Sequence, residues 1–184
     1  MSVKSDLSIA IPQPAPDEYA PYYGKYTSLV EGTDIIATLE AQLADLTPFL
    51  ISIGENNAES RYAPEKWSIK EVLGHVIDTE RIFAYRALRI SRNDKTPIEG
   101  FEQDDYVRFG PFAHCRFLDL IEEFGHVRKS NLAFFRALDE SAWNRRGTAS
   151  ANPVTVRALT YIIAGHVIHH RNVLEKKYLP LLGR

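Results

Sequence analysis

The chain has 184 residues, of which 45% are hydrophobic, and a formal net charge of −2. These values fit one globular domain whose core is large enough to fold without cross-links, and the single cysteine, Cys115, excludes an intrachain disulfide. The pI is about 6.3 and charges of both signs alternate along the sequence, so no basic stripe would follow a phosphate backbone, and nucleic-acid binding is disfavoured.

The N-terminal residues differ in composition from the rest of the chain. Residues 1–31 are rich in proline and tyrosine and lack helical periodicity, so we expect an extended N-terminal arm that wraps a domain formed by residues 32–184. The apolar stretch at residues 9–11 is too short for a signal peptide. No apolar run approaches the roughly 18 residues that a membrane span requires, so we expect a cytoplasmic protein without a membrane partner.

Two helices are predicted in the first half of the chain. The first begins with Thr33 or Asp34 as its N-cap, carries isoleucines and leucines spaced for one face, and ends near Gly54. The second begins at Ser68, where Ser68 and Glu71 have the spacing of a capping box. It extends to about residue 91.

Two more helices are predicted in the second half. A polar connection over residues 93–111 comes first, and internal loops of this length are often functional. The third helix, about residues 117–138, repeats apolar residues every three or four positions, and a Gly/Asn/Pro stretch at 147–153 then breaks the chain before Thr155, the expected N-cap of the fourth. Four amphipathic helices without a convincing alternating strand or repeat predict an all-α four-helix bundle, antiparallel or with a crossover connection.

Three of the six histidines lie close together in the predicted fourth helix. His166 and His170 project from one face, inside its apolar stripe, and one transition-metal ion would satisfy both imidazoles, since each unpaired buried polar group costs about 1–3 kcal/mol. His75, at the edge of the stripe of the second helix, is the best candidate for a third ligand, although other histidines compete. Alternatively, each is a core histidine satisfied by a neighbour. Solvated or supporting roles are expected for His114, His126 and His169.

Two carboxylates lie about one helical turn from His75. Glu71 precedes it and Asp78 follows it, and either could accept the Nδ1–H of the imidazole or complete a coordination shell. The capping box already accounts for Glu71, so a surface role is preferred for that residue. Cys115 is expected to be an inert small hydrophobe rather than a ligand or a reactive thiol.

Four stretches of the sequence carry a resemblance to a known family: WSIKEVLGH at residues 67–75, GFEQD at 100–104, NPVTVRAL at 152–159 and IAGHVIHHR at 163–171. They resemble the DinB-like superfamily of metalloenzymes, four-helix bundles related to the bacillithiol transferase and mycothiol-dependent isomerase enzymes. That family places ligands at the first and fifth positions of His-x-x-His-His, here His166 and His170, and the resemblance implies that His75 is the third. The family tends to have Asp at the position of Glu102 and Gly at that of Asn172, so neither residue is assigned a catalytic role.

Three histidine ligands would leave an ion with open positions, as in catalytic sites. Such an ion can lower the pKa of bound water, which gives a hydrolase, or hold a thiolate, which gives a low-molecular-weight-thiol S-transferase or isomerase. The resemblance favours the second reading, with a small thiol cosubstrate and a small-molecule substrate. Zinc or nickel is the expected metal, with iron as a third choice. The alternatives are a non-catalytic, stress-associated metal-binding module and a helical interaction domain with core histidines, and a homodimer is compatible with each.

Overall fold

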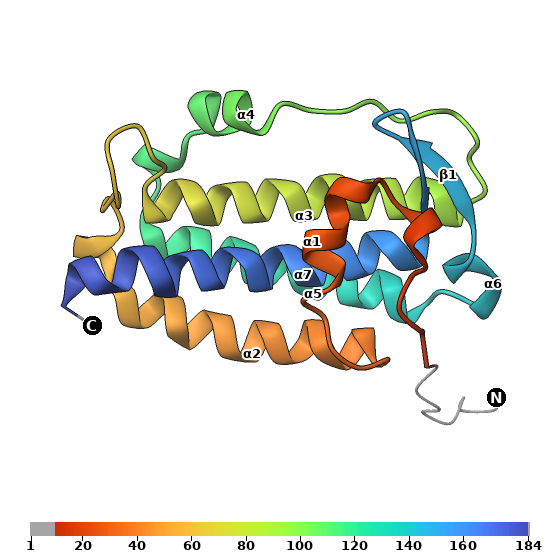
Figure 1. Ribbon diagram of the computed structural model, residues 1–184. Helices are drawn as coiled ribbons and strands as arrows, with labels where there is room; N and C mark the ends of the chain where they lie inside the picture. The colour runs from red at the N-terminus through yellow and green to blue at the C-terminus, as the bar shows by residue number, and fades with distance from the viewer. Residues whose placement is uncertain (1–9, 184) are drawn as a thin grey trace.

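Four long helices form a bundle in the computed structural model, which describes residues 10–183 (Figure 1). They are α2 (Ile35–Ile53), α3 (Ile69–Ser91), α5 (Phe117–Arg136) and α7 (Val156–Val173). Both α7 and α5 pack against α3 and against α2, so α2 and α3 lie diagonally across the bundle. The predicted all-α four-helix bundle is confirmed. The shorter elements that close its ends are η3 (Glu55–Asn57), α6 (Glu140–Trp143), the π-helical turn η5 (Leu174–Tyr178) and η6 (Leu179–Leu182).

The long helices begin at the side chains that the sequence predicts. Asp34 accepts a hydrogen bond from the backbone N–H of Ala37 at 2.9 Å, and Thr155 accepts one from that of Ala158 at 3.0 Å. At Ser68 both bonds of the capping box form, because the Ser68 hydroxyl accepts from the Glu71 N–H and the Glu71 carboxylate accepts from the Ser68 N–H. These caps satisfy backbone donors that have no partner within the helix.

The connection between α3 and α5 runs back along the bundle, because these two helices point in the same direction (Figure 1). It contains α4 (Gln103–Phe109) and the 3-10 turn η4 (Phe112–His114), and both pack against α3. The sequence predicted a polar loop here without a helix. Val107 is the one buried residue of α4, so this segment has no apolar stripe from which a helix could be recognised.

A small hairpin precedes α7 and corrects the expectation that the chain has no strand. β1 (Arg146–Ala149) pairs antiparallel with β2 (Asn152–Thr155), and the turn residues Ser150 and Ala151 both have positive φ, at 50° and 61°. Two such residues make a tight hairpin turn, a conformation usually taken by Asn-Gly or Asp-Gly. The strands have four residues each and the turn has neither signature, so the sequence pattern indicated a break between two helices and no hairpin.

The described part of the N-terminal arm, residues 10–31, lies against the bundle and includes three short helical turns. These are η1 (Pro16–Glu18), η2 (Pro21–Tyr23) and α1 (Gly24–Thr27), and α1 packs on α7. A methyl group placed on Gly165 would lie 2.0 Å from the carbonyl oxygen of Tyr26, so only glycine at this position lets the two helices meet. Residues 1–9 lie outside the described chain, and the division into an arm and a domain at residue 32 stays a prediction.

A polar layer crosses the middle of the bundle between two apolar clusters. Arg128 of α5 and Glu80 of α3 form a bidentate ion pair with N–O distances of 2.7 and 2.8 Å, and their side chains are 0% and 2% exposed. The same guanidinium donates to Gln42 of α2, whose amide in turn donates to the carbonyl of Ala164 on α7. The layer therefore ties all four long helices together and fixes α7 just before His166.

Helix α2 is more apolar than we expected from the sequence. It spans 19 residues with a mean hydropathy of 1.3, which is long and apolar enough to cross a membrane by length and composition. The expectation that no segment approaches this limit is wrong, because Glu40 and Asp45 interrupt the apolar run without lowering its average enough. In the bundle, α2 packs against α5 and α7 and buries Leu39, Leu46 and Leu50, while 22% of its apolar window is buried.

Candidate metal centre

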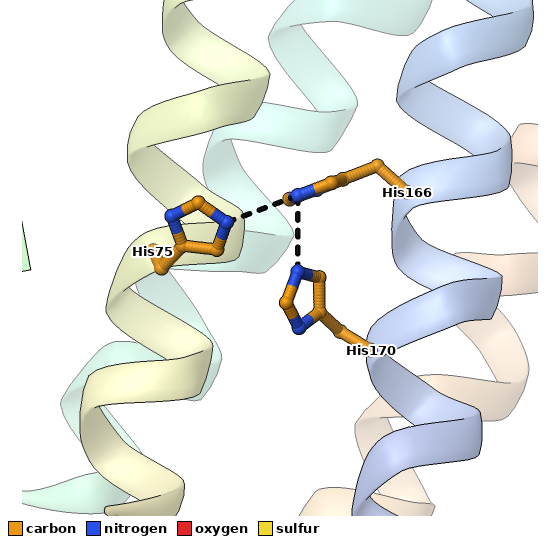
Figure 2. Close-up of side chains that lie close together, drawn as sticks. All are labelled: His75, His166 and His170. Atoms are coloured by element: carbon orange, nitrogen blue, oxygen red, sulfur yellow. Dashed lines mark hydrogen bonds between the residues drawn. The ribbon is translucent and has the colours of Figure 1, made fainter. Parts of the chain in front are cut away.

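Three histidines from two facing helices converge next to the polar layer, between α3 and α7 (Figure 2). His75 comes from α3, whereas His166 and His170 come from successive turns of α7. The Nε2 atom of His166 lies 3.0 Å from the Nε2 of His75 and 3.0 Å from the Nε2 of His170. The structure thus brings together the three residues that the sequence singled out, and these three make up a group able to hold a metal ion within the described chain.

Burial keeps the three imidazoles neutral. Burial, with a smaller contribution from His169, lowers the pKa of His75 to about 4. Burial also lowers the pKa of His166 and of His170 well below the ordinary histidine value, and the neighbouring imidazoles add to both shifts. Near neutral pH each ring therefore carries a nitrogen lone pair, the form in which histidine ligates a metal.

Hydrogen bonds among the three rings cannot satisfy all of them. A neutral imidazole nitrogen presents either one proton or one lone pair, yet His166 Nε2 faces the Nε2 atoms of both neighbours at the same distance. The buried Nδ1 of His170 also has no hydrogen-bond partner in the described chain. Three converging neutral nitrogen donors form a donor set that a divalent transition metal fits, and a single ion would satisfy them together.

A cavity of about 260 Å³ adjoins His75 and His166, and we call it the smaller cavity. Its walls include the rings of Tyr22, Tyr23, Tyr26, Phe83 and Phe101, together with Thr79 and residues Glu102, Gln103 and Asp104. Residues 101–104 belong to the connection that the sequence marked as functional. The crossover of this connection along the bundle thus places polar and aromatic side chains at the histidines.

A second cavity, of about 500 Å³, adjoins His170 and is called the larger cavity. Trp67, Lys66 and Glu65 are among its lining residues, and the ring centroid of Trp67 lies 4.8 Å from that of His75. Asp104 lines both cavities. The three histidines are therefore approached by two cavities that share one carboxylate residue.

The N-terminal segment covers one side of the histidines, which sequence reasoning missed. The Tyr26 ring packs edge-on against His166 and His169, with centroid distances of 5.2 and 5.3 Å. The ammonium of Lys25 lies 3.7 Å from the centroid of the Tyr22 ring. High tyrosine content was the one sequence signal for this contact, and it does not specify where the rings pack.

The remaining sequence candidates stay outside the three-histidine group. Glu71 caps α3 and pairs with Arg61 at 2.6 Å. Asp78, whose pKa is raised by burial, faces Arg81 at 3.6 Å and is not a member of the group. The other residues considered have separate surroundings: His169 is half-buried beside Tyr26, His114 and His126 are exposed, and the Cys115 thiol donates to the carbonyl of Pro111.

Comparisons with known proteins agree with this fold. Among solved structures, the chain is similar to YfiT from Bacillus subtilis, described as "a probable metal-dependent hydrolase with an unusual four-helix bundle topology", at 12% identity and a TM-score of 0.69, over 96% of this chain and 98% of that one. It is also similar to a mycothiol-dependent maleylpyruvate isomerase at 12% identity and a TM-score of 0.64, over 79% of this chain and 61% of that one. At this identity the likeness shows a shared fold.

The sequence itself identifies the family. No protein with a curated description matches the chain. The family model of the DinB superfamily, however, matches residues 38–174, which include α3, α5, α7 and all three histidines. This match covers well over half of the chain and contains the site described above. The protein therefore belongs to the DinB superfamily.

Proposed function

We propose that the protein is a metal-dependent enzyme that joins a low-molecular-weight thiol to an electrophilic small molecule, as a thiol S-transferase or a thiol-dependent isomerase. His75, His166 and His170 would hold the ion. The observation that carries this proposal is the pair of cavities that adjoin one three-histidine group and share Asp104. A reaction between two organic substrates needs two binding spaces at one centre, whereas hydrolysis needs one such space and water.

The chain's own residues would perform three tasks. The neutral imidazoles supply nitrogen ligands, and because no carboxylate or thiol joins the group within the described chain, coordination positions remain for a substrate. An ion held there supplies Lewis acidity that lowers the pKa of a bound thiol, and the thiolate is the nucleophilic form. The rings of Tyr26 and Trp67 pack against His166 and His75 and keep these imidazoles buried, which strengthens electrostatic interactions at the histidines.

The two cavities differ in the groups that they offer. The larger one carries Lys66, Glu65 and Asp104, so we assign it to a polar thiol cosubstrate. The smaller one has no lysine or arginine in its described lining and combines aromatic rings such as Phe83 and Phe101 with polar residues of the connection, so we assign it to the electrophile. Mycothiol dependence is a property of the similar isomerase, and it supports a small thiol as one substrate here.

The proposal also covers the identity of the metal ion, the cellular compartment and the oligomeric state of the protein. Three imidazoles suit zinc or nickel, and also iron, so we propose a divalent transition metal of this group. We also propose that the protein acts in the cytoplasm on small molecules, without a nucleic-acid or membrane partner, and that it forms a homodimer.

A metal-dependent hydrolase is the second candidate. The similarity to YfiT favours it, and so do the carboxylates of Glu102 and Asp104 in the smaller cavity, either of which could take a proton from an attacking water. A non-catalytic metal-binding module is less well supported, because it would show a closed coordination shell and no cavity, whereas this centre has two.

The test is a paired assay on zinc-loaded protein purified without nickel. We expect the wild-type protein to accelerate conjugation of cysteine or another small thiol to monochlorobimane, and His166→Ala to lose this activity. The control His126→Ala, at an exposed site on α5, should retain it. Cleavage of ester or amide substrates that depends on His166, without thiol conjugation, would assign a hydrolase. Stoichiometric metal without either activity would assign the non-catalytic module.

A further inference from the structure

Thr79 is a buried residue of the smaller cavity that the metal centre does not use. It lies on α3 one helical turn after His75 and is 3% exposed. Thr79 is among the residues that line the cavity next to His75 and His166. The hydroxyl oxygen forms no hydrogen bond with any other group in the described chain, although it is buried. A polar atom in this situation needs an explanation, since nearly all buried polar groups are bonded.

Other helical threonines show what Thr79 could have done instead. Thr38, Thr47 and Thr160 each donate to the carbonyl four residues earlier in their helix, at 2.9, 2.9 and 3.0 Å. The same bond from Thr79 would reach the carbonyl of His75, and it would give the buried hydroxyl a partner without any change of sequence. Thr79 does not form it. The hydroxyl is therefore left without a partner within the described chain, at a residue that lines the cavity.

The neighbouring polar groups indicate which role the hydroxyl would take. Glu102 and Asp104 line the same cavity, and an ionised carboxylate accepts hydrogen bonds but cannot donate them. Among these three residues, Thr79 is the one that carries a hydrogen-bond donor, and its hydroxyl is buried with no partner in the described chain.

We propose that Thr79 is a specificity-determining residue, whose hydroxyl donates a hydrogen bond to an acceptor oxygen of the substrate in the smaller cavity. The substrate class is then a small electrophile that carries a carbonyl or similar acceptor oxygen. This inference rests on the proposed function for the assignment of that cavity to the electrophile. It does not require that the reaction be thiol transfer.

The test measures binding rather than turnover. The probe is syn-(methyl,methyl)bimane, a fluorescent molecule with carbonyl oxygens and no leaving group, titrated by anisotropy into the full chain with and without zinc. Thr79→Val removes the hydroxyl at nearly constant volume and should weaken binding about tenfold, the effect of one hydrogen bond of ordinary strength. Thr79→Ser restores the donor and should bind within about twofold of the wild type.

A matched control and a stability measurement separate a binding role from a structural one. Thr160→Val makes the same chemical change at a buried threonine of α7 that bonds its own helix, and it should leave probe affinity unchanged. Thr79→Val should raise the melting temperature of the metal-free protein by about 2–4 °C, because it removes an unpartnered buried hydroxyl. A lower melting temperature would instead mean that Thr79 has a structural hydrogen bond.

The outcomes distinguish this proposal from the proposed function. Equal probe affinity of Thr79→Val and wild type, or no probe binding by the wild type, would overturn the role of Thr79. Failure of the proposed function has a different signature, which is wild-type protein that holds no ion or conjugates no thiol. A Thr79-dependent affinity in metal-free protein would support the binding role even in that case.

Discussion

His75, His166 and His170 meet because helix geometry and helix packing act together. The four-residue spacing on α7 places two imidazoles on one face, and α3 brings the third to 3.0 Å from His166. The spacing on α7 could be read from the sequence alone. The position of His75 opposite this pair is a consequence of tertiary packing, and it became an expectation only through the resemblance to a family.

Single substitutions should divide the histidines into two classes. His75→Ala, His166→Ala and His170→Ala are each expected to abolish stoichiometric zinc binding, because two imidazoles hold an ion much more weakly than three. His114→Ala, His126→Ala and His169→Ala should retain one zinc per chain. Elemental analysis of each purified variant measures this ratio. Equal zinc content in wild type and His166→Ala would show that the site lies elsewhere.

The buried imidazoles should also make the metal-free protein sensitive to acid. The pKa of His75 is about 4 in the folded state and about 6.5 when exposed, so between these values the unfolded chain binds more protons. The free energy of unfolding is therefore expected to rise with pH across this window, with the full contribution present above about pH 6.5 and lost as pH falls toward 4.

Urea unfolding of metal-free protein at about pH 5 and pH 7 measures the effect of His75. Replacement by a residue that does not titrate, His75→Gln, should reduce the difference in stability between the two pH values, whereas His126→Ala, at an exposed position, should preserve it. An undiminished difference in His75→Gln would mean that this imidazole is not held neutral by burial.

At the scale of the elements, the Glu80–Arg128 pair holds α3 against α5 and is fully enclosed. Glu80→Leu leaves the Arg128 guanidinium buried without its counter-charge, and it should lower the free energy of unfolding by about 3–5 kcal/mol. The double variant Glu80→Leu/Arg128→Met, which removes both charges, should regain most of this loss. Chemical denaturation of the three proteins measures the coupling, and a single variant that loses less than about 1 kcal/mol would contradict a stabilising pair.

The elements that the sequence predicted correctly are those specified by local signals. Asp34, Ser68 and Thr155 mark helix starts because each caps backbone groups within three residues of itself. The β1–β2 hairpin and α4 escaped prediction because their strands and buried faces are too short to show periodicity. The contacts of Tyr26 and Arg128 join segments far apart in the chain, and no local pattern encodes them.

At the scale of the whole molecule, metal binding and folding should be linked, although folding does not require the metal. The bundle buries two large apolar clusters on either side of the polar layer, so helical structure is expected to persist after chelation. An ion that binds only the folded state at about 100 times its dissociation constant adds about 2.7 kcal/mol, which for a chain of this size is about 5–11 °C in melting temperature. Circular dichroism with and without a chelator measures both, and loss of helical signal on chelation would contradict the account.

Three imidazoles are expected to hold an ion that remains open to a thiol. X-ray absorption at the zinc edge of loaded protein, recorded before and after addition of cysteine, tests this expectation most directly. We expect histidine nitrogen neighbours at about 2.0–2.1 Å from the zinc in both states, and one new sulfur neighbour at about 2.3 Å after cysteine is added. A first shell without histidine scattering, or a shell that stays unchanged when the thiol is present, would contradict this expectation.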